Sequence, residues 1–385
     1  MNAPAQIDND GLTRFHDDVA ASRQLPELNQ WMTLAESAVE PNVFLAPQML
    51  LPALKFFDAD NRVFLFQAFS DSGELIGLIP VVMTGTYRGL PLRHLTTWRH
   101  QHSFLGSPLV SPGHERTFWT QFFSWADCQP GALFLRMEKI GGEGALAQSL
   151  AEVCQNSRRF RSLTSVSRRA VLQSDLDPKA YFERATRSKK RKKFRSMMKH
   201  LRNEGEVSFA RKSETNGLGE WLDEYLKLEN SGWKGKEGTA IACCDHETAF
   251  FEAAMRLCAQ HGMLDRVEMR LDGEPIALLL NLRSAPGAFG FKTTYDEVYA
   301  RFSPGVQLEI FNLNMLEDAE IAWTDSCAAE NHPMIDHIWT ERREIFSCNI
   351  GLGGSLQQSG ARVLSFLEDL ARRLSSVMRR GQYGK

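Results

Sequence analysis

The chain has 385 residues, of which 43% are hydrophobic and 24% charged, a composition typical of a globular protein with about two domains. A formal net charge of −2 gives the chain as a whole no attraction for polyanions, so DNA is not an expected partner. The longest apolar runs have the length of strands and fall short of the ~20 residues that a membrane helix requires. With no secretory-signal pattern at the polar N-terminus, we expect a cytoplasmic protein, at most peripheral at the inner membrane face.

The seven cysteines favour buried, reduced thiols over a disulfide framework or a metal centre. Their number is odd, and no C-x-x-C spacing occurs. A metal site built from Cys327, His332 and Cys348 would lack the dense ligand spacing that such sites usually show, so no metal is expected.

The first half of the chain predicts helices followed by a hairpin. Helical signals occur in residues 25–39, and an apolar run covers 49–57. Residues 63–83 form a strand, an Asp-Ser-Gly turn and a second strand, a hairpin pattern. A further strand is expected at 132–140 and a helix at 145–153.

The second half begins after a turn at 174–178, where Asp177 is expected to cap a helix whose first residue is Pro178. Apolar stripes predict helices around 218–225 and 251–258, and Gly262 is expected to end the second of these. Residues 267–282 again read as a hairpin, with a tight turn at Asp272-Gly273. Later segments predict a strand at 321–327 and a helix at 334–343.

The two hairpins indicate a tandem duplication. The segments GELIGLIPV from Gly73 and GEPIALLLN from Gly273 share Gly, Glu, Ile and Leu in register, and helical segments precede both. We therefore predict an α+β fold with an N-terminal domain at 1–174, a second domain at 175–350 and a helical extension at 351–385. Each domain is expected to hold a mixed, mainly antiparallel sheet flanked by helices.

The stretch FKTTYDEVYARFSPGVQLEIF (291–311) leads from a strand through a Ser-Pro-Gly turn into an apolar helix. The backbone N–H groups at a helix start lack partners within the helix and carry the positive end of its dipole. Gly305 allows close approach to that backbone, and Arg301 adds a guanidinium, so the turn can hold a pyrophosphate. From spacing alone, a helix start without a ligand is the slightly favoured interpretation.

Four phrases carry a family resemblance: SGWKGKEGTAI (231–241), LDGEPIA (271–277), FKTTYDEVYARFSPGVQL (291–308) and DSCAAENHPMIDHIW (325–339). They resemble the tandem GNAT-fold acetyltransferase-like proteins associated with bacterial cellulose and exopolysaccharide synthesis, which are related to the Fem-type transferases. The loop RFSPGVQL departs from the usual GNAT pattern Q/R-x-x-G-x-G/A, because it has one extra residue and no second glycine.

The resemblance implies two GNAT-like domains and an N-acyltransferase that uses acetyl-CoA, or another acyl-CoA, as co-substrate. It places the CoA pyrophosphate on the backbone of Ser303, Pro304, Gly305 and Val306, with Arg301 beside it. The acceptor would be an amino-sugar, or a sugar linked to a nucleotide or lipid. The first domain would be a degenerate copy that shapes the substrate cleft. Its loop GTYRGLPLRH (85–94) has no glycine directly before a helix that is comparable to Gly305.

Several residues are candidates for the chemistry. Strand alternation puts Lys292 and Thr294 on one face, and Lys292 is a candidate to bind phosphate or stabilise developing negative charge. Asp296 and Asp325 are candidate general bases, although either carboxylate also suits a turn cap. Trp233, Lys234 and Tyr295 are candidates for substrate binding, although Trp233 could equally be a tryptophan that packs at the edge of the core. His332 is a further catalytic candidate, and the alternative for it is a residue at a helix start.

The segment 184–205 predicts a basic amphipathic helix that ends at Gly205. Ten Lys and Arg residues fall between Arg184 and Arg202 without an acid, whereas the rest of the chain has 35 basic against 47 acidic residues. Such a helix attracts polyanions: tRNA, an anionic membrane, or a substrate with phosphate groups.

Two other functions remain open. One is Fem-type transfer from aminoacyl-tRNA, although the long helical hairpin of many such enzymes is absent from the sequence. The other is a non-catalytic effector on a GNAT scaffold, with a cyclic dinucleotide such as cyclic di-GMP held by the arginine clusters, which include Arg372, Arg373, Arg379 and Arg380.

Overall fold

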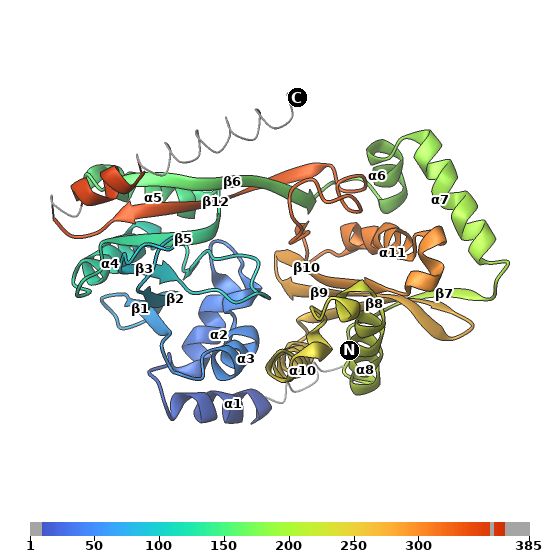
Figure 1. The fold of residues 1–385 in the computed structure, drawn as a ribbon, viewed down its shortest axis with the longest axis horizontal. Helices are drawn as coiled ribbons and strands as arrows, with labels where there is room; N and C mark the ends of the chain where they lie inside the picture. The colour runs from blue at the N-terminus through green and yellow to red at the C-terminus, as the bar shows by residue number, and fades with distance from the viewer. Residues whose placement is uncertain (1–9, 355–357, 366–385) are drawn as a thin grey trace. The chain divides into compact units, whose positions relative to one another are not determined.

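The fold is taken from a computed structural model, which describes residues 10–354 and 358–365 (Figure 1). Its α-helices are α1 (Asp10–Ala20), α2 (Leu28–Ser37), α3 (Pro47–Phe57), α4 (Glu115–Asp127), α5 (Ala145–Asn156), α6 (Pro178–Ala185), α7 (Ser188–Leu201), α8 (Leu218–Ser231), α9 (Trp233–Lys236), α10 (Asp245–Gln260) and α11 (Pro304–Asn312). Short 3₁₀ helices are η1 (Val43–Leu45), η2 (Ile241–Cys243), η3 (Glu297–Phe302) and η4 (Leu313–Glu317).

The strands are β1 (Phe64–Phe69), β2 (Leu75–Thr84), β3 (His94–Thr97), β4 (Leu109–Val110), β5 (Phe134–Gly141), β6 (Arg161–Leu172), β7 (Val207–Lys212), β8 (Leu264–Leu271), β9 (Glu274–Ser284), β10 (Gly287–Tyr295), β11 (Trp323–Asp325) and β12 (Glu341–Gly351). Both predicted hairpins, β1–β2 and β8–β9, are present and antiparallel. The predicted start of α6 is also confirmed, since Asp177 caps it and Pro178 is its first residue.

The chain folds into two compact units whose boundaries differ from those predicted. Unit 1 combines residues 1–61 with 168–343, and unit 2 combines 62–167 with 344–385. The N-terminal helices therefore belong with the second half of the chain. The physical reason is burial: eight consecutive residues of α3 are buried, the Phe57 ring packs tilted against Phe250, and the Phe44 ring packs edge-on against Phe289.

In unit 1, strands β7, β8, β9 and β10 form an antiparallel series, and β11 joins β10 in parallel. Helix α11 covers one face of these strands, and α8 and α10 cover the other (Figure 1). The alternation of β9 explains this, because Ala277 and Leu279 pack with Leu308 of α11, whereas the residues between them face the opposite layer.

Unit 2 repeats this order of elements. The hairpin β1–β2 pairs with β3 in antiparallel, α4 follows, and β5 then joins β3 in parallel. Unit 1 has the same succession, with β8–β9, β10, α11 and β11. The repeat confirms the α+β fold predicted from the matching hairpin sequences.

One predicted element is wrong. Residues 334–340 form turns and an irregular segment, and strand β12 begins at Glu341, so the helix expected at 334–343 is absent. Tertiary packing overrides the helical pattern here, because Ile335, Ile338 and Trp339 enter a core cluster with Ala170, Leu172 and Tyr181.

The arginine cluster at 372–380, and most of the predicted C-terminal helix, lie outside the described residues; residues 358–365 are helical. None of the helices in the described ranges combines the length and the apolar character needed to cross a membrane.

Candidate functional site

Helix α11 begins at the predicted Ser-Pro-Gly turn. Ser303 adopts a left-handed conformation with φ 53°, and its N–H donates to the carbonyl of Ala300 at 2.9 Å. Pro304 has no N–H, and the helix ladder starts with the Gln307 N–H donating to Ser303 O at 3.0 Å. No side chain caps the helix and no acid lies in its first turn. The pyrophosphate cradle predicted over Ser303–Val306 is therefore reduced to the N–H groups of Gly305 and Val306.

Gly305 lies beneath two side chains. A Cβ atom added to it would lie 3.1 Å from Met334 Sδ and 3.3 Å from Tyr295 Cδ1, and Gly305 is itself buried. Arg301 is largely exposed and pairs with Glu204 at 2.9 Å. A diphosphate at this helix start would therefore have to displace Met334 and compete with Glu204 for the guanidinium.

Strand β10 loses its parallel partner partway along its length. It pairs with β9 from Gly287 to Tyr295, with a register irregularity between Gly290 and Lys292. Its pairing with β11 covers only Gly287–Phe289. The edge from Lys292 to Tyr295 thus has no neighbouring strand in the described sheet, and its backbone leads from the irregularity to the start of α11.

Lys292 follows this irregularity. As predicted, it lies on the opposite face from Thr293, which contacts Glu309 of α11. Burial lowers the pKa of Lys292 from 10.5 to about 8; the charges of Glu229 and Glu247 oppose this shift, and that of Lys234 adds to it. A lysine with this pKa is partly neutral near physiological pH and can exchange protons with a substrate.

The three predicted substrate-binding residues line one small pocket of about 30 Å³. Trp233, which is 51% exposed, Lys234 and Tyr295 share its wall with Thr294 and Glu229. Trp233 and Lys234 lie on the four-residue helix α9. Sequence reasoning missed Glu229, which is 2% exposed and bonds to Lys234 Nζ at 2.7 Å and the Ile241 N–H at 2.9 Å.

The two candidate carboxylate bases have structural partners. Asp296 accepts a hydrogen bond from the Val298 N–H at 2.9 Å and so caps η3. Asp325 is fully buried and pairs with Arg169 at 2.5 Å and Arg343 at 2.9 Å. These contacts favour the turn-cap alternative for Asp296 and a structural charge cluster around Asp325. His332 lies in a turn, away from any helix start.

Unit 2 contains a second Ser-Pro-Gly turn, Ser111–Gly113, directly before α4. It occupies the place in the repeat that Ser303–Gly305 occupies in unit 1. The segment 85–94, where a counterpart of this turn was expected, connects β2 to the first residue of β3 instead. Here Glu115 accepts a hydrogen bond from the Gly113 N–H at 3.1 Å. The carboxylate occupies the helix start and repels anions, which fits a degenerate copy.

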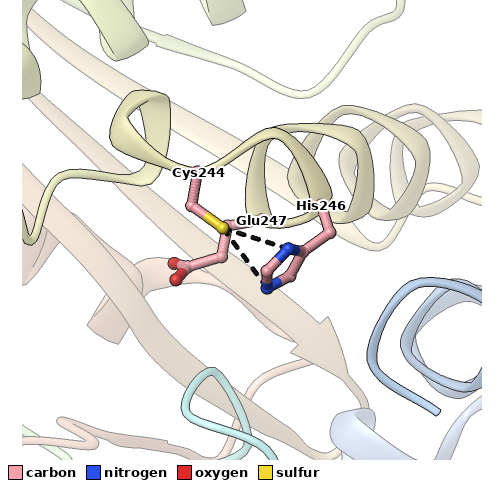
Figure 2. Close-up of side chains that lie close together, drawn as sticks. All are labelled: Cys244, His246 and Glu247. Atoms are coloured by element: carbon pink, nitrogen blue, oxygen red, sulfur yellow. Dashed lines mark hydrogen bonds between the residues drawn. The ribbon is translucent and has the colours of Figure 1, made fainter. Parts of the chain in front are cut away.

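A cysteine, a histidine and a glutamate meet at the start of α10, away from the Cys327, His332 and Cys348 set considered above. Cys244 Sγ lies 3.1 Å from Nδ1 and 3.2 Å from Nε2 of His246 (Figure 2). With Glu247 they form a group whose potential ligand atoms all lie within 4.8 Å of one another.

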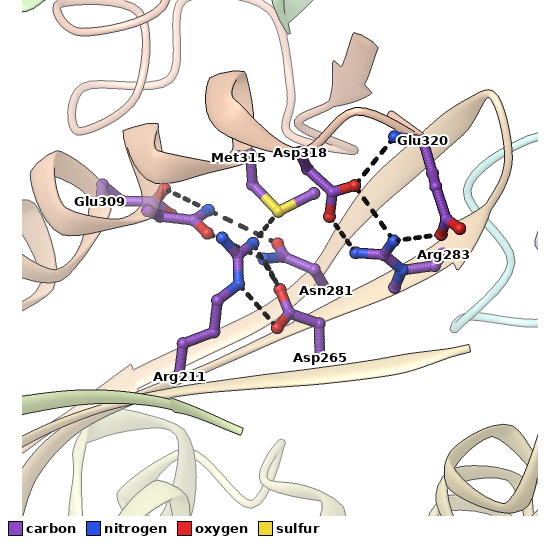
Figure 3. A network of polar contacts seen from close by, with 9 residues as sticks. Arg211, Asp265, Asn281, Arg283, Glu309, Met315, Asp318 and Glu320 are labelled. Atoms are coloured by element: carbon purple, nitrogen blue, oxygen red, sulfur yellow. Dashed lines mark hydrogen bonds and ion pairs between the residues drawn. The ribbon is translucent and has the colours of Figure 1, made fainter. Parts of the chain in front are cut away.

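A buried polar network lies between α11 and the sheet (Figure 3). Asn281 Nδ2 donates to Asn312 at 2.8 Å and to Asp265 at 3.0 Å, and Asp265 pairs with Arg211 at 2.7 Å. Asn312 also contacts Glu309, whose burial raises its pKa to about 7. The sequence feature that could have predicted this network is Asn281, a polar residue inside the apolar strand segment LLLNL (278–282), because a buried polar side chain requires hydrogen-bond partners.

Comparison with known proteins places the family match on unit 1. Residues 188–327 match the family model described as an acetyltransferase (GNAT) domain. The match includes α7, the pocket residues and the start of α11. No curated protein sequence matches the chain.

Solved structures resemble the whole chain at low sequence identity. FemX has a TM-score of 0.56 at 8% identity, covering 89% of this chain and 99% of that one. The C-terminal domain of a putative lysylphosphatidylglycerol synthetase from Agrobacterium fabrum has a TM-score of 0.54 at 11% identity, covering 91% and 96%. L-PGS from Bacillus licheniformis has a TM-score of 0.52 at 12% identity, covering 91% and 97%. The chain thus has a fold of two GNAT-like units in tandem, and its acetyltransferase (GNAT) domain match lies at residues 188–327.

Proposed function

We propose that the chain is an N-acyltransferase that moves an acyl group from the thioester of an acyl-CoA to an amino group of a sugar. The observation that carries this proposal is the open edge of β10, which leads from Lys292 to the uncapped start of α11 inside the segment matched as an acetyltransferase (GNAT) domain. An acyl-CoA aligned along this edge has its thioester near Lys292 and its pyrophosphate at Gly305 and Val306, where its binding moves Met334 aside.

In this arrangement a neutral amine attacks the thioester carbonyl directly. The amine–carbonyl bond forms, and backbone N–H groups at the edge of β10 stabilise the oxyanion. The intermediate then breaks the carbon–sulfur bond and releases the CoA thiolate. Lys292 accepts the proton that the attacking amine loses and returns it to the thiolate.

We place the acceptor over the mouth of the small pocket lined by Trp233, Lys234 and Tyr295, whose volume of about 30 Å³ is too small to enclose a sugar ring. Trp233 offers an exposed ring suited to the apolar face of a sugar. The sequence resemblance supplies the expected context, an exopolysaccharide pathway, in which the acceptor sugar is linked to a nucleotide or lipid.

A negative charge introduced at Val306, the third residue of α11, tests whether the acyl-CoA donor binds at this helix start. Val306→Glu places a carboxylate where the pyrophosphate would bind, at a helix position that normally favours Glu. We expect acetyl-CoA affinity, measured by calorimetry on the full chain, to fall more than tenfold, because one like-charge contact costs over about 1.4 kcal/mol in a partly buried site.

The matched control is His114→Glu, at the corresponding position after the second Ser-Pro-Gly turn, which should leave acetyl-CoA affinity unchanged. Wild-type protein without affinity for any acyl-CoA would refute the proposal. Release of free thiol from acetyl-CoA with amino-sugar acceptors then measures transfer itself.

A second candidate function, transfer from an aminoacyl-tRNA, is favoured by one observation: the exposed cationic surface of α7. The structural likeness to FemX and to the domain of a putative lysylphosphatidylglycerol synthetase fits this alternative. Calorimetry with aminoacyl-tRNA beside acetyl-CoA discriminates the two donors. Cyclic di-GMP binding without binding of either donor would point to the non-catalytic effector.

A further inference from the structure

We propose that Cys244, His246 and Glu247 form a binding site for a zinc ion at the start of α10. The three residues supply a thiol sulfur, an imidazole nitrogen and a carboxylate oxygen, all within 4.8 Å of one another. A fourth coordination position would remain open to water or to a substrate atom. This proposal is independent of the acyl donor and of the reaction.

The distances suit tetrahedral coordination. Metal–ligand bonds of about 2.0 to 2.3 Å put neighbouring ligand atoms about 3.4 to 3.6 Å apart around zinc. Cys244 Sγ already lies 3.1 and 3.2 Å from the two ring nitrogens of His246. Both ring nitrogens lie close to the sulfur, so a rotation of the imidazole directs one nitrogen at the metal (Figure 2).

Local structure explains why these side chains converge. Cys244 precedes the first residue of α10 in an extended conformation, φ −141° and ψ 118°, which turns its side chain back toward the first helical turn. His246 and Glu247 lie in that turn. The Glu247 carboxylate is favourable at the positive end of the 16-residue helix, so it stays in the first turn beside the other two side chains.

The ligand types favour zinc over magnesium or calcium. Thiolate and imidazole are ligands for zinc and other borderline or soft metals, whereas magnesium and calcium prefer sets composed entirely of oxygen atoms. A thiolate and a carboxylate together balance the charge of the divalent ion.

The site adjoins the candidate acceptor pocket. Glu247 acts electrostatically on Lys292, as does the pocket residue Glu229. The sulfur and imidazole are accessible, since Cys244 is half-buried and His246 is exposed. An ion from solvent can therefore reach the site without any rearrangement of the core.

Zinc titration of the reduced full chain against a chromophoric chelator tests the proposal. We expect one equivalent of zinc per chain, and a loss of affinity of more than about tenfold in Cys244→Ser and in His246→Ala, since each removes a ligand. Cobalt titration should produce a thiolate-to-metal charge-transfer band that Cys244→Ser abolishes and that magnesium does not reproduce.

Cys243→Ser is the matched control. Cys243 is exposed and adjacent in sequence, and its sulfur lies 3.5 Å from Asn230 Oδ1, outside the proposed ligand set. Ser is also a favourable N-cap residue, so Cys244→Ser should keep α10 folded, which circular dichroism checks. The proposal is overturned if wild-type protein binds no stoichiometric zinc, or if Cys244→Ser and Cys243→Ser bind it equally.

Discussion

Lys292 is the side chain that accepts the proton of the attacking amine in the proposed reaction. It follows the irregularity in β10, and burial lowers its pKa to about 8 against the opposing charges of Glu229 and Glu247. The sequence placed Lys292 on the correct face of the correct strand. Its carboxylate neighbours on α8 and α10 could not be predicted, because they meet Lys292 only through packing.

The transferase proposal predicts a pH dependence set by Lys292. Because only neutral Lys292 accepts a proton, kcat/KM should rise with pH and level off above about 8. Lys292→Met should remove this limb and lower kcat at least about a hundredfold. Glu229→Gln should move the limb to lower pH, because it removes a charge that raises the pKa of Lys292.

Lys292→Met should lower activity but raise stability, which distinguishes a catalytic loss from unfolding. The folded-state pKa of Lys292 lies below the unfolded value of 10.5, so the unfolded chain binds more protons between about pH 8 and 10.5. The free energy of unfolding therefore gains from Lys292 as pH rises through this window. Lys292→Met should be more stable than wild type below pH 8 in urea denaturation; lower stability there would contradict this account.

Helix α7 shows how an element can be predicted from sequence while its partner is not. Its basic amphipathic pattern is confirmed: Phe194 and Leu201 are buried, and Gln307 of α11 donates to the Phe194 carbonyl at 2.9 Å. The bounds predicted for it, 184–205, are wrong at both ends, because Arg184 lies in α6 and α7 covers only Ser188–Leu201. Its cationic face stays exposed. Within the described part of the chain, no ion pair involves Lys189, Lys192, Lys193 or Lys199.

We propose that this face contacts an anionic membrane surface. Each lysine near such a surface contributes about 1 kcal/mol, so changing these four lysines to Gln should weaken binding to phosphatidylglycerol vesicles by roughly a thousandfold. Vesicle sedimentation at low and high salt measures this, with phosphatidylcholine vesicles as the control. Unchanged lipid binding with lost tRNA binding would instead assign the face to RNA.

Each of the two units is built from two segments that are separated in the sequence. Residues 10–61 precede unit 2 in sequence but pack into unit 1, and β6 and β12 each begin in one unit and end in the other. Leu51 and Leu54 of α3 are fully buried, and Glu40 pairs with Arg343. The segment matched as a GNAT domain is therefore incomplete as a folding unit.

A fragment of residues 168–343 should fail to fold stably, because it exposes Phe250 and Phe289 and leaves the buried Arg343 without Glu40. Joining residues 10–61 to it through a flexible Gly/Ser linker should restore cooperative unfolding, as followed by circular dichroism in urea. In the full chain, Leu54→Ala should cost about 2–5 kcal/mol. Cooperative unfolding of the 168–343 fragment alone would show that the N-terminal helices are dispensable.

The sequence by itself determined what depends on neighbouring residues along the chain. Both hairpins, the cap at Asp177, the turn before α11 and the basic helix follow from periodicity and turn chemistry, which act over a few residues. Tertiary structure alone decided the rest: Met334 over Gly305, the irregular path of 334–340, the packing of α3 on α10, and the approach of Glu229 to Lys292. These contacts join residues far apart in the chain, and no local pattern encodes them, because they form only when the sheet brings distant segments into one core.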